Sequence, residues 1–198
     1  MLLHKKLENY NLILASASPR RRQLLADCGI QFTLAEKFEC DETFPATMPC
    51  CEVAQHISAL KSNAYPNPLS EKEILLTADT VVIAENKILG KPADRAEAVE
   101  MLTLLSGRKH TVVTGVTIRS KSRTHCFSVE SKVSFRNLTN EEIEYYIDNY
   151  QPFDKAGAYG IQEWIGYVAI DGIEGSFFNV MGLPVQRLYV ELSEFVSR

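Results

Sequence analysis

Residues 12–22, LILASASPRRR, place a strand, a short turn and a helix start in immediate succession. Leu12 to Ala15 form a continuous apolar run, which is typical of a strand that is covered on both faces. Ser18 can then serve as a helix N-cap, and Pro19 suits the first helical position because an N–H there would lack a partner anyway. A buried strand that leads into a helix is the repeating unit of α/β folds, so this stretch favours that class.

Similar strand and helix signals alternate along the rest of the chain. Capping residues and apolar side chains at helical spacing predict helices over residues 52–64, 94–107 and 139–150 and from Pro184 onward. Apolar runs predict strands over residues 74–83, 110–118 and 124–136, and strand material is also expected from Trp164 to Val180. Because long hairpin-like strands accompany the helical crossovers, the sequence predicts an α/β protein with a mixed sheet.

The composition is that of an ordinary globular protein, and it narrows the range of partners. The 198 residues suit a single domain, 1–198, with 45% hydrophobic and 23% charged residues. The formal net charge of −4 argues against a general binder of nucleic acid or anionic membranes. The sequence has no signal-peptide core and no membrane span, and its five cysteines lack a Cys-x-x-Cys pair, which indicates reduced thiols. We therefore expect a cytoplasmic protein without a membrane partner or a stable nucleic-acid partner.

Positive charge is concentrated at the start of the first predicted helix. Arg20, Arg21 and Arg22 occupy its first turn, where the helix dipole favours acidic residues instead. Unpaired backbone N–H groups at a helix start and the forks of guanidinium groups both match the geometry of phosphate. This arrangement indicates an anion-binding site, and a solvated basic turn is the alternative.

One carboxylate lies inside an apolar strand signal. Asp79 interrupts the run ILLTADTVVI of residues 74–83, and burying a carboxylate is costly unless it is paired, hydrogen-bonded or bound to metal. Asp79 is therefore interpreted as a metal ligand, a general base or both, with a structural aspartate at a bulge as the alternative. The adjacent acids Asp41 and Glu42 follow a loop, where solvated surface residues are the more common case.

Three further segments offer groups that could contact a ligand. Lys61 lies at the edge of an apolar helix face and could reach a phosphate, although surface lysines are common. Lys91 stands between Gly90, which permits close approach, and Pro92, which stiffens the segment. Residues 154–162, DKAGAYGIQ, combine small, charged and aromatic residues, and the amide of Gln162 could read a base edge or be an ordinary loop amide.

Eight segments, taken in order, resemble the signature segments of the Maf family, nucleoside triphosphate pyrophosphatases related to the inosine triphosphatase fold. They are Ser16 to Arg21, Asp41-Glu42, Lys61, Ala78-Asp79-Thr80, Gly90-Lys91-Pro92, Leu105-Ser106-Gly107, Asp154 to Gln162 and Asn179 to Pro184. Each segment is a weak signal alone, but the ordered set is specific and extends from about Leu12 to Leu192. The resemblance implies an elongated mixed β-sheet flanked by helices, the inosine triphosphatase-like (Maf/Ham1) fold.

The resemblance also implies a reaction: hydrolysis of a nucleoside triphosphate to the monophosphate and pyrophosphate with a divalent cation, Mg²⁺ or Mn²⁺. It makes Asp79 the proton acceptor that activates water, and Glu42 and Asp79 the metal ligands. The phosphate-binding residues that it implies are Arg20, Arg21, Lys61 and Lys91, with Ser16 in the same phosphate-facing turn.

Base choice is implied by the same resemblance. In the branch that acts on dTTP and UTP, the positions that influence it match Arg20, Thr80 and Gln162. The Gly-Ile-Gln ending of residues 154–162 resembles that branch rather than the one acting on 7-methyl-GTP, and modified pyrimidine nucleotides are further candidate substrates. Two positions depart from the usual pattern: Ser62 replaces alanine after Lys61, and Glu163 replaces glycine after Gln162, where it adds a charge.

Several alternatives stay open at the level of sequence. Asp79 could bind the metal, accept the proton or act through a metal-bound water, because a metal-bound carboxylate is a weaker base. The main alternative function is a nucleotide-sensing regulatory protein of cell division without significant turnover, and a third is a phosphatase that releases orthophosphate. The resemblance also suggests a homodimer.

Overall fold

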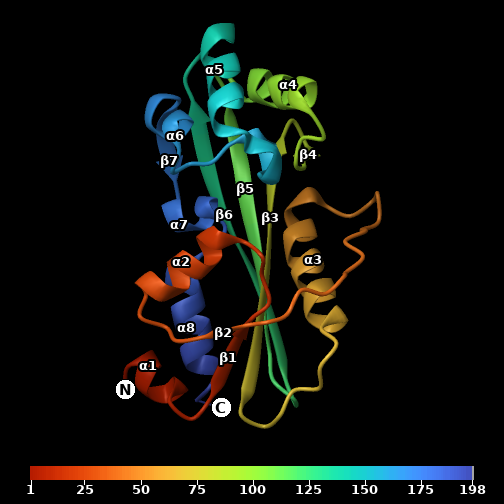
Figure 1. The fold of residues 1–198 in the computed structure, drawn as a ribbon, viewed down its shortest axis with the longest axis vertical. Coiled ribbons are helices and arrows are strands. Elements are labelled where there is room, and N and C mark those ends of the chain that lie inside the picture. Colours follow the sequence, from red (N-terminus) through yellow and green to blue (C-terminus); the bar gives the residue numbers. More distant parts are fainter. Residues whose placement is uncertain (198) are drawn as a thin grey trace. The chain divides into compact units, whose positions relative to one another are not determined.

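The structure is a computed structural model that describes residues 1–197, and within them it contains a seven-stranded mixed sheet with helices on its faces (Figure 1). The strands are β1 (Asn11–Leu14), β2 (Thr33–Leu34), β3 (Glu73–Ala84), β4 (Lys87–Leu89), β5 (Lys109–Arg119), β6 (Thr124–Phe135) and β7 (Ile170–Glu174). The α-helices are α1 (Leu3–Leu7), α2 (Pro19–Asp27), α3 (Cys50–Ala64), α4 (Arg95–Leu105), α5 (Asn140–Tyr150), α6 (Trp164–Val168), α7 (Phe177–Met181) and α8 (Val185–Phe195), and the short 3₁₀ helices are η1 (Pro152–Asp154) and η2 (Ala156–Ala158).

The strand order is β2-β1-β3-β5-β6-β7, with β4 paired to β3. Strand β1 is parallel to β2 and β3, whereas β4 is antiparallel to β3 and β7 is antiparallel to β6. The predicted α/β class and mixed sheet flanked by helices are therefore confirmed. Within residues 1–197, no helix is long and apolar enough to cross a membrane.

The chain forms two compact units. Unit 1 contains Met1–Asp79, Thr114–Val129 and the segment from Gly182 onward, and unit 2 contains Thr80–Val113 and Glu130–Met181. Strands β3, β5 and β6 each contribute residues to both units. The single domain expected from the chain length stays a prediction.

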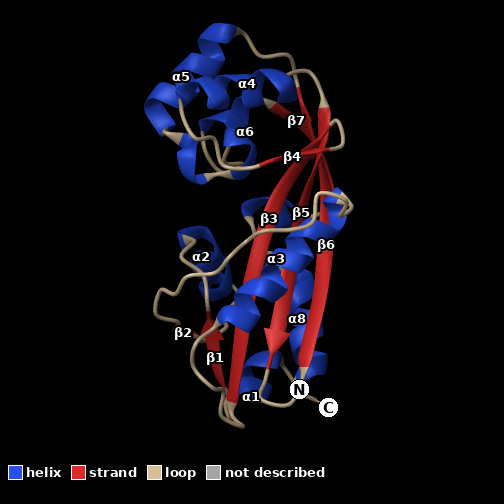
Figure 2. Ribbon diagram, turned by 90° about the vertical axis from the view of Figure 1, so that its right-hand side faces the viewer, coloured by secondary structure: helices blue, strands red, loops and turns tan. Residues whose placement is uncertain are grey.

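In unit 1, helix α3 lies on one face of the strands and α8 lies on the other (Figure 2). The α3 backbone lies directly on β5, because a Cβ added to Gly115 would be only 2.2 Å from the backbone nitrogen of Gln55. Buried hydroxyls tie the same elements together: Thr77 of β3 donates to the Ser58 carbonyl at 2.7 Å, and the Ser58 and Thr117 hydroxyl oxygens are 2.8 Å apart. These contacts fix the helix that carries Lys61 against the strand that carries Asp79.

Unit 2 has its own apolar core, with an aromatic cluster inside it. The rings of Phe135 and Tyr159 both pack edge-on against His110, and the Nε2 atom of His110 is 2.8 Å from the Tyr159 hydroxyl. Burial lowers the pKa of His110 to about 4, so the ring is neutral at physiological pH. Helix α5 begins with a capping box of Thr139 and Glu142.

The strand material expected from Trp164 to Val180 is the main error of the sequence prediction. Only Ile170–Glu174 forms a strand, and it is flanked by the short helices α6 and α7. The aromatic, β-branched and glycine residues of this segment favour strands or loops, but tertiary packing overrides that preference. A Cβ on Gly166 would lie 1.7 Å from the Ile161 carbonyl oxygen, so this glycine permits α6 to pack closely on the preceding loop.

Candidate active site

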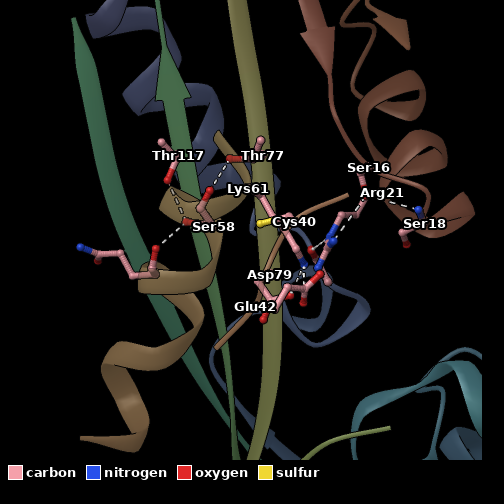
Figure 3. A network of polar contacts seen from close by, with 12 residues as sticks. Ser16, Ser18, Arg21, Cys40, Glu42, Ser58, Lys61, Thr77, Asp79 and Thr117 are labelled. Carbon is pink, nitrogen blue, oxygen red and sulfur yellow. Dashed lines mark hydrogen bonds and ion pairs between the residues drawn. The ribbon is translucent and has the colours of Figure 1, made fainter. Parts of the chain in front are cut away.

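The centre of the candidate site in unit 1 is a lysine that bridges two carboxylates. The Nζ atom of Lys61 is 2.7 Å from Oδ1 of Asp79 and 3.1 Å from Oε2 of Glu42 (Figure 3). The Asp79 side chain is 14% exposed and that of Lys61 is 19% exposed, whereas the Glu42 side chain is 51% exposed. The buried-strand carboxylate is thus paired, as its cost of burial requires, and three segments distant in sequence supply the cluster.

Arg21 is held at this cluster by two oxygen atoms. Its Nε donates to the Gly182 carbonyl at 2.7 Å, and its Nη1 donates to the Ser16 hydroxyl at 3.4 Å. The Ser16 hydroxyl also accepts from the Ser18 N–H at 3.3 Å, so it organises the turn that leads into α2. Ser18 occupies the N-cap position as predicted, but its own side chain makes no capping hydrogen bond.

The charges of this cluster act on one another. Burial is the main cause that lowers the pKa of Arg21, and the charge of Arg20 lowers it further. The negative charges of Asp79 and Glu42 act in the opposite direction. The guanidinium stays protonated because its ordinary pKa lies so far above neutrality. Three cationic and two anionic side chains therefore share one electrostatic environment: Arg20, Arg21, Lys61, Glu42 and Asp79.

Two contributors to this site were missed from the sequence. Gly182 lies in the Asn179 to Pro184 segment of the family resemblance, but no role was predicted for it, because a backbone carbonyl that anchors an arginine leaves no sequence signal. Cys40 was interpreted only as a reduced thiol, but its sulfur lies beside the Lys61 cluster (Figure 3). Burial and the charge of Glu42 raise the pKa of Cys40, while Lys61 opposes them, so the thiol stays protonated near neutral pH.

The remaining candidate residues, Thr80, Lys91 and Gln162, belong to unit 2. Thr80 directly follows Asp79 on β3 and is half-buried, whereas Lys91 and Gln162 are exposed. The Gly157 N–H donates to the Gly90 carbonyl at 3.0 Å, which joins the segment of Lys91 to the loop that ends at Gln162. Within unit 2 the structure therefore joins two of the segments that offer candidate ligand-binding groups.

The carboxylates at Lys61 suit a metal that arrives with its own phosphate ligands. Across residues 1–197, no group of three or more His, Cys, Asp and Glu side chains could hold a metal ion. Glu42 and Asp79 do converge on one cation, the Lys61 ammonium. Mg²⁺ commonly takes one or two protein carboxylates and completes its shell with water and substrate phosphates, so this pair fits such an ion.

Comparisons with known proteins extend over nearly the whole chain. Residues 11–195 match the family model described as Maf-like protein. A protein of Parabacteroides distasonis named dTTP/UTP pyrophosphatase is 49% identical over 191 residues, which cover 96% of this chain and 99% of that protein. A protein of Bacteroides thetaiotaomicron with the same name is 47% identical over 188 residues, covering 95% of this chain and 97% of that protein.

Among solved structures, a HAM1 protein from Coxiella burnetii is similar at 14% identity and a TM-score of 0.45, covering 93% of this chain and 99% of that chain. The family assignment rests on the sequence matches alone.

Proposed function

Because this chain belongs to the Maf family, we propose that it hydrolyses nucleoside triphosphates, with dTTP and UTP as the leading substrates, to the monophosphate and pyrophosphate. The names of the relatives that are 47–49% identical support this reaction and these substrates. In the structure, the observation that carries the proposal is the Lys61 ammonium between Asp79 and Glu42, beside Arg21. A triphosphate complexed with a divalent metal needs cations for its oxygens and carboxylates for its metal at the same place.

Binding of the triphosphate is assigned to the cationic side chains. Arg20, Arg21 and Lys61 hold phosphate oxygens, and the contacts of Arg21 to Gly182 and Ser16 fix the plane of its guanidinium group. Lys91, in unit 2, stays a proposed phosphate-binding residue. Glu42 and Asp79 would hold Mg²⁺ or Mn²⁺, which neutralises phosphate charge when it is bound.

The chemical step is assigned to Asp79. When phosphate oxygens draw the Lys61 ammonium away, the Oδ1 atom of Asp79 loses its 2.7 Å partner and can accept a proton from water. The water oxygen bonds to phosphorus, its proton passes to Asp79, and pyrophosphate leaves with the electron pair of the broken anhydride bond. Lys61 and Arg21 stabilise the charge that develops on the phosphate oxygens.

Recognition of the base is assigned to Arg20, Thr80 and Gln162. Uracil and thymine present a carbonyl acceptor at position 4 beside an N–H donor at position 3. The Gln162 amide carries one donor group and one acceptor atom, so it can satisfy both positions at once. Its exposed position leaves it accessible to such a ligand.

A panel of canonical and modified nucleoside triphosphates with Mg²⁺ or Mn²⁺ tests the proposal. We expect pyrophosphate release, fastest with dTTP and UTP and abolished by a chelator. Release of orthophosphate would indicate a phosphatase instead. Tight nucleotide binding without turnover would indicate the regulatory nucleotide sensor, and a preference for purines would contradict the assignment to dTTP and UTP.

We place the reaction in the cytoplasm because all five cysteines are free, as is usual in reducing compartments. The homodimer that the family resemblance suggests stays a prediction.

A further inference from the structure

Unit 2 also contains a lysine between two carboxylates, Lys155, and the proposed reaction does not use it. The Lys155 side chain is only 9% exposed, and its Nζ donates to Oδ1 of Asp154 at 2.7 Å and lies 3.0 Å from Oε1 of Glu163. The other oxygen of Glu163 accepts a hydrogen bond from the Tyr146 hydroxyl. That hydroxyl in turn accepts from the Gly160 N–H at 3.0 Å.

The lysine and the tyrosine of this network are buried, and its parts are closely packed. Tyr146 is fully buried, and burial together with the neighbouring Glu163 raises the pKa of Tyr146, so its hydroxyl remains a donor. A Cβ on Gly160 would lie 2.9 Å from Cδ of Glu163 and 3.0 Å from Cε of Lys155, so the loop backbone rests on the ion pair itself. Removing one partner from such a network leaves a buried group unsatisfied, so the arrangement is rigid.

The position of the network on the chain gives it a role beyond stability. The Gly160 N–H and the Glu163 carboxylate meet at the same Tyr146 hydroxyl, and a turn from the Glu163 N–H to the Gly160 carbonyl at 3.0 Å closes the segment between them. Gln162 lies within this closed segment and is exposed. The network therefore fixes the backbone on both sides of the proposed base reader.

A primary amide must be held in one orientation to select a base, because a freely turning amide can bind more than one hydrogen-bonding pattern. By turning over, it can pair with the carbonyl and N–H of uracil or with the amino group and ring nitrogen of cytosine. Only an amide held in a defined position can favour one pattern. We infer that Tyr146, Lys155 and Glu163 are positioning residues that hold Gln162 for bases with a carbonyl at position 4, so that UTP is preferred over CTP. This inference rests on the proposed function.

The test compares UTP with CTP in Tyr146→Phe, which removes one hydroxyl and keeps the ring. We expect the ratio of kcat/KM for UTP over CTP to fall by about tenfold, the worth of roughly one hydrogen bond, mainly through KM for UTP. Inhibition by inorganic tripolyphosphate, which has no base, should stay within about twofold of the wild-type value. Tyr150→Phe is the matched control, because this more exposed tyrosine stacks on Tyr146 in the same helix.

Glu163→Gln carries the test if Tyr146→Phe does not fold, because it keeps the size of the side chain and removes only its charge. An unchanged ratio of UTP to CTP in the folded variants would overturn the inference. A loss of tripolyphosphate inhibition as large as the loss of kcat/KM for UTP would also overturn it, since the variant would then bind the phosphate chain less well and not only the base. Wild-type protein without any triphosphate turnover would instead refute the proposed function, so the two failures are distinguishable.

Discussion

Each unit contains a lysine between two carboxylates, but the two lysines differ in exposure and their carboxylates differ in how they are held. In unit 1, Lys61 is 19% exposed and one of its partners, Glu42, is 51% exposed. In unit 2, Lys155 is 9% exposed while its partners Asp154 and Glu163 are 60% and 23% exposed, and Glu163 is also bound by a fully buried tyrosine. The same ion-pair chemistry therefore serves two purposes: the more exposed Lys61 can exchange its partners for a ligand, whereas the more buried Lys155, whose partner Glu163 is also bound by a tyrosine, holds a loop in place.

Asp79→Asn should have the largest effect, because it removes the proposed proton acceptor from the Lys61 cluster. We expect kcat for UTP to fall by at least about a thousandfold, with little change in thermal stability. Steady-state pyrophosphate release together with a thermal melt checks this. The matched control is Asp41→Asn, an exposed acid next to Glu42 that should leave turnover near the wild-type rate. Wild-type activity in Asp79→Asn would remove this residue from the mechanism.

His110→Gln should change stability rather than turnover, as expected for the buried interior of unit 2. The pKa of His110 is lowered from 6.5 to about 4, so the unfolded chain binds more protons than the folded chain as pH falls through this window. The destabilisation that this pKa shift causes is absent well above pH 6.5. Between pH 7 and pH 5 it lowers the free energy of unfolding by about 2 kcal/mol.

Urea unfolding at pH 7 and pH 5 measures this contribution. The His110→Gln variant should lose about 2 kcal/mol less than the wild type over this interval, whereas His4→Gln, at an exposed position, should behave like the wild type. Equal pH dependence in His110→Gln and the wild type would show that His110 is not held neutral by burial.

Lys61→Met tests whether the accessible lysine competes with a metal. Its ammonium occupies the point where Glu42 and Asp79 converge, so removing it should strengthen Mn²⁺ binding without nucleotide by about tenfold while lowering kcat/KM for UTP. Calorimetric titration with Mn²⁺ measures the affinity. Lys121→Met removes an exposed lysine paired with Glu71 and should leave it unchanged. The competition would be refuted by equal Mn²⁺ affinities in Lys61→Met and the wild type.

Ser62→Ala should have the smallest effect of these substitutions, and it should stabilise the protein. The Ser62 hydroxyl is fully buried and has no hydrogen-bond partner within residues 1–197. Removing it should raise the unfolding free energy by up to about 1 kcal/mol, because an unsatisfied buried hydroxyl is costly and alanine favours helices. Ser58→Ala, one turn earlier, should instead lower it by about 1 kcal/mol, since that hydroxyl is bonded to Thr117. Denaturant unfolding that shows equal destabilisation in both variants would contradict this contrast.

Local patterns in the sequence were sufficient for most of the fold. Apolar runs and capping residues predicted β1, β3, β5, β6 and the helices α2 to α5 and α8, because these elements follow their own propensities. The helices in segment 164–180 were not predicted, because their residues favour strands or loops. Helix α6 packs closely on the preceding loop at Gly166, and such packing has no local sequence signal. Helix α1, with five residues, was also missed, since a single short turn carries little periodic signal.

The candidate site was predictable only in part, for a similar reason. A carboxylate inside an apolar run signals that a partner exists, and this is why Asp79 stood out. The sequence could not show that Lys61 is that partner, nor that Glu42 shares it. Arg21 contacts the Gly182 carbonyl and Tyr146 contacts Glu163, and in both cases the two residues belong to different segments of the chain. The periodic patterns of single helices and strands therefore carry no signal for such contacts. Only the packed structure reveals them.

A crystal structure of the wild-type protein with a non-hydrolysable dTTP analogue and Mg²⁺ is the most direct test that the Lys61 cluster exchanges its internal ion pairs for a triphosphate. We expect phosphate oxygens bonded to Lys61 and Arg21, with the Lys61 ammonium no longer bridging Asp79 and Glu42. A triphosphate bound away from Lys61 and Arg21, or a Lys61 that keeps its present contacts beside the bound nucleotide, would contradict this claim.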